Sequence, residues 1–126
     1  MQNEREKFKE NFINRLVKFS VEIIKFSQEI RKERILWPIA DQLVRSATSI
    51  GANVVEAKAS SSKKDYLNYF QIALKSANET KYWLIVLKES STDLNPKAQQ
   101  FYVEADEISK IIGSSVLTLK GKKDAF

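Results

Sequence analysis

The feature that most constrains this 126-residue chain is a mostly apolar series that steps by four and three residues without interruption. The series comprises Tyr66, Phe70, Ala73, Ala77, Thr80, Leu84 and Leu87. This spacing places every member on one face of an α-helix. A second series runs beside it through Tyr69, Ile72, Ser76, Glu79, Trp83 and Val86. A helix with two adjacent seams can contact two neighbours, as the helices of bundles and oligomers do.

Three other segments carry a single apolar stripe at helical spacing, and the chain contains only three glycines and two prolines to interrupt them. The stripe of the first segment, which we expect to face the core, comprises Phe8, Phe12, Leu16, Phe19, Ile23, Phe26 and Ile30. Pro38 and Pro96 suit the first turn of a helix, and Ser62 followed by Asp65 resembles a capping box. Gly121 can end the last helix, with a frayed tail after it. We predict an all-α fold, an antiparallel up-down-up-down four-helix bundle in one domain over residues 1–126, with helices at residues 3–32, 38–58, 63–89 and 96–119.

The complete lack of histidine and cysteine excludes most catalytic and metal-binding chemistry. Catalytic triads, thiolate nucleophiles, disulfides and histidine- or thiolate-bound zinc sites all need one of these residues. No apolar run approaches the roughly 20 residues that cross a bilayer, and the mixed-charge start does not resemble a signal peptide. We therefore expect a cytoplasmic protein that is not an enzyme and that holds no metal or cofactor.

Polar side chains flank the apolar stripe of the second predicted helix, where Arg45, Ser49, Asn53 and Glu56 follow at steps of four, four and three. Antiparallel packing against the third helix would bring Glu79 near this stripe. Guanidinium and carboxylate match well in a fork geometry, so we expect an Arg45–Glu79 pair within a structural polar network. The alternative is a ligand or catalytic cleft built on Glu56 and Glu79. The lack of histidine and of a glycine-rich phosphate loop favours the structural role.

The net charge of +5 is distributed unevenly along the predicted bundle. In an up-down topology, the first helix start, the turn between helices two and three, and the chain end share one pole. Nine cations and six acids fall there, whereas five of each cancel at the opposite pole. Such a patch suits a polyanion. The candidate nucleic-acid-binding residues are Lys58, Lys63, Lys64, Lys120, Lys122 and Lys123.

Four aromatic residues invite the hypothesis of base stacking, since rings interleaved with lysines can bind single strands. Their helical spacing instead assigns Tyr66, Tyr69 and Trp83 to the helix seams. Only Tyr82 falls outside both seams, beside Lys81.

Three sequence runs resemble a known family. They are QLVRSATSIGANVVEA at residues 42–57, SKKDY at residues 62–66 and ALKSANETKYWL at residues 73–84. In this order they resemble the signature of the bacterial four-helix-bundle proteins, also called 23S rRNA intervening-sequence proteins. The chain departs from the pattern at residues 57–59, where the usual glycine is missing, and in a first helix without the common tryptophan-containing opening.

The resemblance implies a four-helix bundle that tends to form homopentamers, with a polar pattern that Arg45, Ser49, Asn53, Glu56 and Glu79 match. Some members are encoded within intervening sequences of ribosomal RNA genes, and members are often labelled ribosomal-protein-like. The accessory variability protein of diversity-generating retroelements, which joins a reverse transcriptase and nucleic acid, looks like a relative.

The leading hypothesis is a basic homo-oligomeric module that binds RNA or DNA backbone through its lysines. The alternative is a scaffold with a polypeptide partner and no nucleic-acid role.

Overall fold

The computed structural model of the protein describes the backbone of residues 3–123 and the side chains of residues 3–121. Within that range the chain forms four α-helices and one short 3-10 helix, η1, at Arg34–Leu36. The helices are α1 Glu4–Ile30, α2 Trp37–Ala59, α3 Lys63–Ser90 and α4 Asn95–Lys123. The prediction of an all-α fold with four helices is confirmed. No helix in the described residues is long and apolar enough to cross a membrane.

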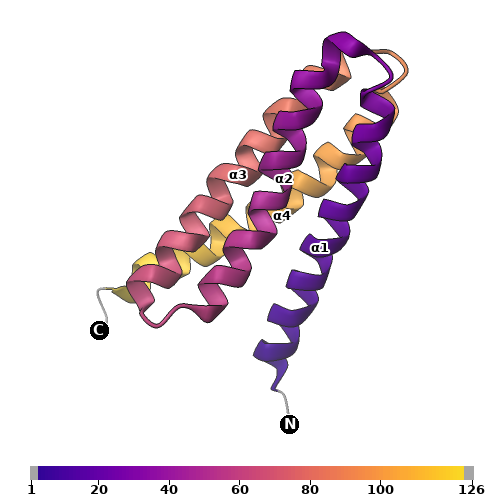
Figure 1. Cartoon of the computed structure of the whole chain (residues 1–126). Coiled ribbons are helices and arrows are strands. Elements are labelled where there is room, and N and C mark those ends of the chain that lie inside the picture. The colour runs from indigo at the N-terminus through magenta and orange to yellow at the C-terminus, as the bar shows by residue number, and fades with distance from the viewer. Residues whose placement is uncertain (1–2, 124–126) are drawn as a thin grey trace.

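Figure 1 shows that consecutive helices run in opposite directions, so that the start of α1 and the end of α4 lie at the same end of the bundle. Side-chain contacts between α2 and α3 agree with these opposite directions. Ser46 and Ser49 on α2 contact Thr80 and Ser76 on α3, so one number rises as the other falls. In the same figure α1 diverges from α2 toward the end that holds its N-terminus.

Two helix starts use the side-chain caps that their sequences favour. The Asn3 side chain accepts a hydrogen bond from the Glu6 backbone N–H at 2.8 Å, and Ser62 accepts one from the Asp65 N–H at 3.1 Å. Each bond satisfies one of the backbone donors that a helix start leaves without a partner.

The prediction that Gly121 ends the last helix is wrong, because α4 continues to Lys123. Glycine ends a helix when it adopts a left-handed conformation just beyond it. No described glycine has a positive φ. A glycine that keeps helical angles costs about 1 kcal/mol of propensity relative to alanine, which does not stop a long helix. Residues 124–126 of the predicted tail lie outside the described part of the chain.

The core lies along the inward faces of all four helices, where the predicted stripes place it. Leu16 and Ile23 on α1, Leu43 on α2 and Leu84 on α3 are almost completely buried. One predicted core residue is misplaced, since Phe8 is 60% exposed. It lies on the first turns of α1, where that helix diverges from its neighbours (Figure 1).

Helix α1 contacts α2 and α4 in different ways. Against α2, backbone and side chain meet closely, because a Cβ added to Gly51 would lie 3.3 Å from the Leu16 Cβ. Against α4, a large ring fills the space. The Phe101 ring centroid lies 6.2 Å from that of Phe19 and 5.1 Å from that of Phe26. Edge-to-face and tilted pairs at these distances are favourable.

A bidentate ion pair lies at the surface of the contact between α1 and α4. Arg15 donates to Glu104 from Nε at 2.8 Å and from Nη2 at 2.7 Å, and its Nη2 also lies 3.2 Å from Glu107. These hydrogen bonds lower the pKa of Glu104 and raise that of Arg15. Both side chains are about one third exposed, at 31% and 34%, so solvent screens much of the attraction.

The glycine contact gives a first prediction. In Gly113→Ala the new Cβ meets only the end of the Leu74 side chain, at 3.9 Å, so helix propensity should raise stability by about 0.5–1 kcal/mol. In Gly51→Ala the new Cβ meets the Leu16 Cβ, which is fixed to the backbone of α1, so the gain should be cancelled or reversed. Urea unfolding of both variants measures the difference. Equal stabilisation by the two substitutions would show that α1 moves freely at this contact.

The ion pair gives a second prediction, about pH. A lowered carboxyl pKa in the folded state contributes stability above the unfolded pKa of about 4.3, and this contribution is lost as the pH falls through the folded value. The stability difference between the wild type and Glu104→Gln should therefore shrink as the pH falls below about 4. Unfolding titrations between neutral and acidic pH measure it. Glu89→Gln is the control, because Glu89 makes no ion pair within the described residues. A pH-independent difference for Glu104→Gln would contradict the coupling.

Candidate nucleic-acid interface and polar seam

The predicted polar residues of α2 meet α3 along a seam whose outer edge is charged. Arg45 Nη2 donates to Glu79 Oε2 and also to the Gln42 side chain at 3.0 Å. The Trp83 indole N–H donates to the same Glu79 oxygen at 3.0 Å. The Arg45 and Glu79 side chains are 58% and 36% exposed, so the pair lies at the surface. Exposed pairs contribute at most about 1 kcal/mol.

Deeper in the α2–α3 seam, the polar contacts are made by hydroxyl groups and not by charged groups. The Ser46 and Thr80 hydroxyls are fully buried and lie 2.9 Å apart. Ser49 accepts from Ser76 at 2.9 Å and from the Asn53 amide at 3.0 Å. Sequence reasoning included Ser49 and Asn53 in a polar network but missed the Ser46–Thr80 contact. Both residues lie at helical spacing among the apolar residues of their helices. The sequence pattern therefore does not distinguish them from ordinary core residues.

Glu56 does not take part in this seam. It is exposed near the end of α2 and makes no hydrogen bond or ion pair within the described residues. No recorded contact joins it to Glu79 or Arg45, so the two carboxylates do not form a paired acid–base site. No group of three or more acidic residues in the described chain could hold a metal ion.

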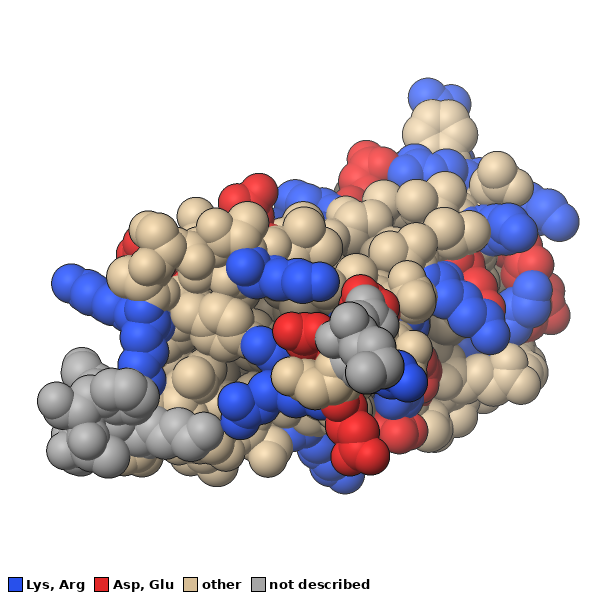
Figure 2. All heavy atoms as spheres, turned by 90° about the horizontal axis from the view of Figure 1, so that it is seen from below, with Lys and Arg blue, Asp and Glu red and all other residues tan. Residues whose placement is uncertain are grey.

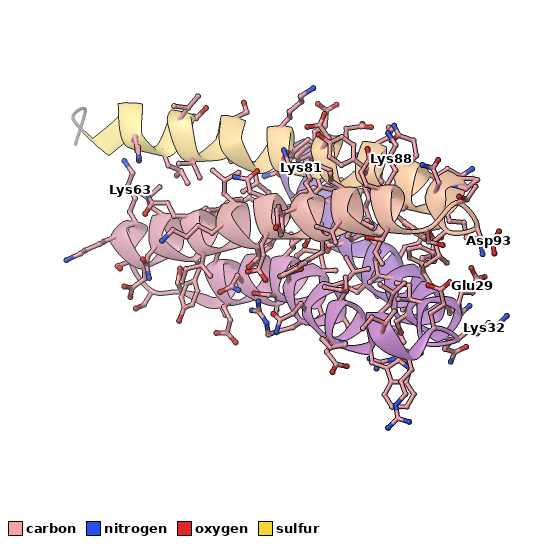
Figure 3. All side chains as sticks on the ribbon, turned by 90° about the horizontal axis from the view of Figure 1, so that it is seen from above. Glu29, Lys32, Lys63, Lys81, Lys88 and Asp93 are labelled. Atoms are coloured by element: carbon pink, nitrogen blue, oxygen red, sulfur yellow. The ribbon has the colours of Figure 1, made fainter. Side chains whose placement is uncertain are left out.

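The candidate nucleic-acid-binding lysines with described side chains gather at one end of the bundle, here called the basic pole. Lys58 lies on the last turn of α2, Lys63 and Lys64 begin α3, and Lys120 lies near the end of α4. Figure 3 shows Lys63 extending toward the end of α4, at the opposite end of the molecule from Lys32. The predictions for Lys122 and Lys123 concern side chains outside the described ones.

Several cations near the basic pole have no recorded carboxylate partner. Every ion pair recorded between described residues uses a cation between Arg15 and Lys110 in the sequence. Within the described residues, none involves Arg5, Lys7, Lys9, Lys58, Lys64 or Lys120. No described carboxylate forms an ion pair with these six cations, and Lys9 lies over the Tyr66 ring. Figure 2 views this end of the bundle, and blue side chains border a tan, hollowed area on its left side.

A pocket of about 480 Å³ opens at the basic pole between the α2–α3 turn and the outer turns of α1 and α4. We call it the hydroxyl-rich compartment. Its cations are Arg5, Lys9 and Lys63. Its hydroxyl groups come from Ser60, Ser61, Ser62, Tyr66, Ser114, Ser115 and Thr118. No Asp or Glu is among its described lining residues.

A second pocket, of about 190 Å³, adjoins the first and shares Arg5, Lys9, Tyr66 and Ser115 with it. We call it the aromatic compartment. Its apolar lining residues are Phe8, Phe12, Ile13, Val54, Tyr66, Phe70 and Ile111. Lys58 adds a third cation, and no carboxylate is among its described lining residues. Apolar walls with a few convergent cations are typical of ligand sites.

Sequence reasoning found the basic pole but not its pocket. Phe8 and Tyr66 were assigned to the core because both continue a helical stripe, yet they line the aromatic compartment. A sequence signal for it is the run Gly113, Ser114 and Ser115, which places small and hydroxyl-bearing residues in the second half of α4. Of the lysines that the sequence singled out, Lys58 and Lys63 line the two compartments, whereas Lys64 and Lys120 lie outside them.

Comparison with known proteins identifies a similar solved structure and a matching family. A crystal structure of a protein of unknown function from Bacteroides thetaiotaomicron, assigned to the S23 ribosomal protein family, is 32% identical and superimposes with a TM-score of 0.78. The match covers 83% of this chain and 97% of that one. No curated protein gives a significant match. The model of the 23S rRNA-intervening sequence protein family matches residues 9–114, which include all of α2 and α3. This chain belongs to the 23S rRNA-intervening sequence protein family.

Proposed function

We propose that the protein is a non-enzymatic, homo-oligomeric module of the cytoplasm that binds RNA or DNA through its basic pole. The observation that carries this proposal is that Arg5, Lys58, Lys64 and Lys120 gather at that pole without ion-pair partners in the described residues. Phosphate oxygens would supply the missing negative charge, and displacement of condensed counterions would drive binding.

The pattern of charge suits backbone contacts rather than base-edge recognition. Lys58 and Lys64 are exposed, flexible point charges, whereas the arginines at Arg15, Arg31 and Arg45 are occupied by carboxylates. Lysine binds phosphate as a point charge, while bidentate recognition of guanine commonly uses arginine. Binding should therefore be salt-sensitive and largely independent of sequence.

An apolar stripe on the outer face of α1 supports the homo-oligomeric part of the proposal, for which the resemblance suggests a pentamer. Val17, Val21 and Ile24 are 56%, 44% and 44% exposed and follow at steps of four and three. A second copy would remove these side chains from water. In a symmetric assembly, each basic pole is repeated, so several weak phosphate contacts act together.

The same stripe also favours a second candidate function, a scaffold that binds another polypeptide without nucleic acid. An apolar helix face can serve a different protein as well as a second copy. The two functions differ in their response to salt, because burial of apolar surface is not weakened by added salt whereas phosphate contacts are.

A matched pair of charge reversals tests nucleic-acid binding. The double variant Lys58→Glu with Lys64→Glu should weaken binding of a labelled RNA hairpin more than tenfold. It should also reduce the slope of log K against log salt by about 1.4–1.8, because each lost phosphate contact removes about 0.7–0.9. Fluorescence anisotropy across a salt series measures both quantities.

The control is Lys25→Glu with Lys32→Glu, which changes the net charge equally but lies away from the basic pole (Lys32 in Figure 3). It should leave the slope nearly unchanged. Equal losses in the two double variants would mean that only net charge matters. No binding by the wild type even at low salt would refute the nucleic-acid function and leave the scaffold.

Light scattering tests the oligomeric part. The wild type should have a mass that is a multiple of 14.5 kDa, and Val21→Glu should reduce it toward that of one chain. A charge buried in an apolar interface is costly, which gives the direction. Leu117→Glu is the control, because Leu117 is 73% exposed on α4. A wild-type mass of 14.5 kDa would contradict the proposal.

A further inference from the structure

We infer that the pocket at the basic pole holds one unpaired nucleotide of a single-stranded nucleic acid, with its base in the aromatic compartment and its phosphate in the hydroxyl-rich compartment. This inference rests on the proposed nucleic-acid binding and adds to it a preference for single strands. Its basis is the joining of two chemically different compartments by shared lining residues, with no carboxylate among the described lining residues of either one.

The aromatic compartment offers rings in an arrangement suited to stacking. The Phe8 and Phe12 rings lie 6.5 Å apart and nearly parallel, at 10°, and Phe8 keeps 60% of its surface exposed. The Tyr66 and Phe70 rings lie 4.9 Å apart at 18°. Single-strand-binding proteins use exposed rings near cations, because every base presents a π-face. The exposed surface of the Phe8 ring would gain from such a partner.

The hydroxyl-rich compartment offers an anion both charge and hydrogen-bond donors. Lys9 Nζ lies 5.5 Å from the Tyr66 ring centroid, at the junction of the two compartments. Arg5 also lines both and makes no ion pair with a described residue. Charge-assisted bonds to phosphate are about twice as strong as neutral ones. A phosphate at this junction would therefore leave its attached sugar and base pointing toward the rings.

The volume of the aromatic compartment limits how many bases it can hold. A cavity of about 150 Å³ can hold a benzene molecule, so a compartment of about 190 Å³ fits one flat ring system with its polar edge directed to solvent or to Lys58. A base inside a duplex is paired and stacked on both sides, so it presents no free face. The compartment can therefore be filled by an unpaired nucleotide and not by a paired one.

The test compares one RNA in two forms, a labelled unstructured single strand and the same strand in a blunt duplex, with full-length protein in fluorescence anisotropy. Phe8→Ala should weaken binding of the single strand about tenfold and leave duplex binding within about twofold, because only the single strand offers a base to stack. Phe8 is mostly exposed, so the fold should tolerate its removal. Tyr82→Ala, at an aromatic residue that is 58% exposed on α3, should change neither affinity.

A second variant fills the compartment. Ile111→Trp, at a half-buried lining residue on α4, should produce the same selective loss, with circular dichroism to verify that the helices remain. Octanoate, an anion with an acyl chain in place of a base, should not displace the single strand.

Each outcome separates this inference from the function on which it rests. Selective loss for the single strand in both variants supports the inference. Equal loss on both RNAs, or no loss, overturns it while lysine-dependent binding still stands. Displacement by octanoate overturns it in favour of an acyl-anion site. Failure of the wild type to bind either RNA overturns both.

Discussion

The close contact between Gly51 on α2 and Leu16 on α1 sets the position of the first helix, and the arrangement of the basic pole depends on it. At this point the two helices approach as nearly as two backbones with one Cβ between them allow. On the other side, the Phe101 ring separates α1 from α4. Beyond these contacts the first turns of α1 diverge from the bundle (Figure 1), Phe8 is exposed, and the pocket lies at the basic pole.

The recorded ion pairs are also distributed unevenly between the middle of the bundle and the basic pole. Along the middle, ion pairs such as Arg15–Glu104 and Arg45–Glu79 join neighbouring helices and fix their faces. At the diverging end, Arg5 and Lys58 have no carboxylate partner in the described residues. The proposed polyanion would replace those partners. Ion pairs thus join the helices along the middle, while Arg5 and Lys58 at the pole are available for binding.

Particular residues show how far sequence reasoning reached. Leu16, Ile23 and Leu84 were assigned to the core by helical spacing alone, and all three are buried. Phe8 has the same spacing and is exposed, because spacing says which face a residue occupies but not whether a neighbour covers that face. Likewise, the hydroxyl pair of Ser46 and Thr80 could not be separated from the apolar stripes that contain it, since a buried hydroxyl needs a partner that only the packed fold identifies.

The sequence by itself determined the four helices, their apolar faces and the excess of lysine near three of their ends. Those properties depend on residues three or four apart and are therefore local. The tertiary structure decided which lysines would meet aromatic rings and which cations would find a carboxylate. Lys58, Phe8 and Ile111 share one compartment although they lie on three different helices. Their meeting depends on the angle at which α1 leaves α2, which is set by contacts between residues far apart in the chain, and no local pattern encodes it.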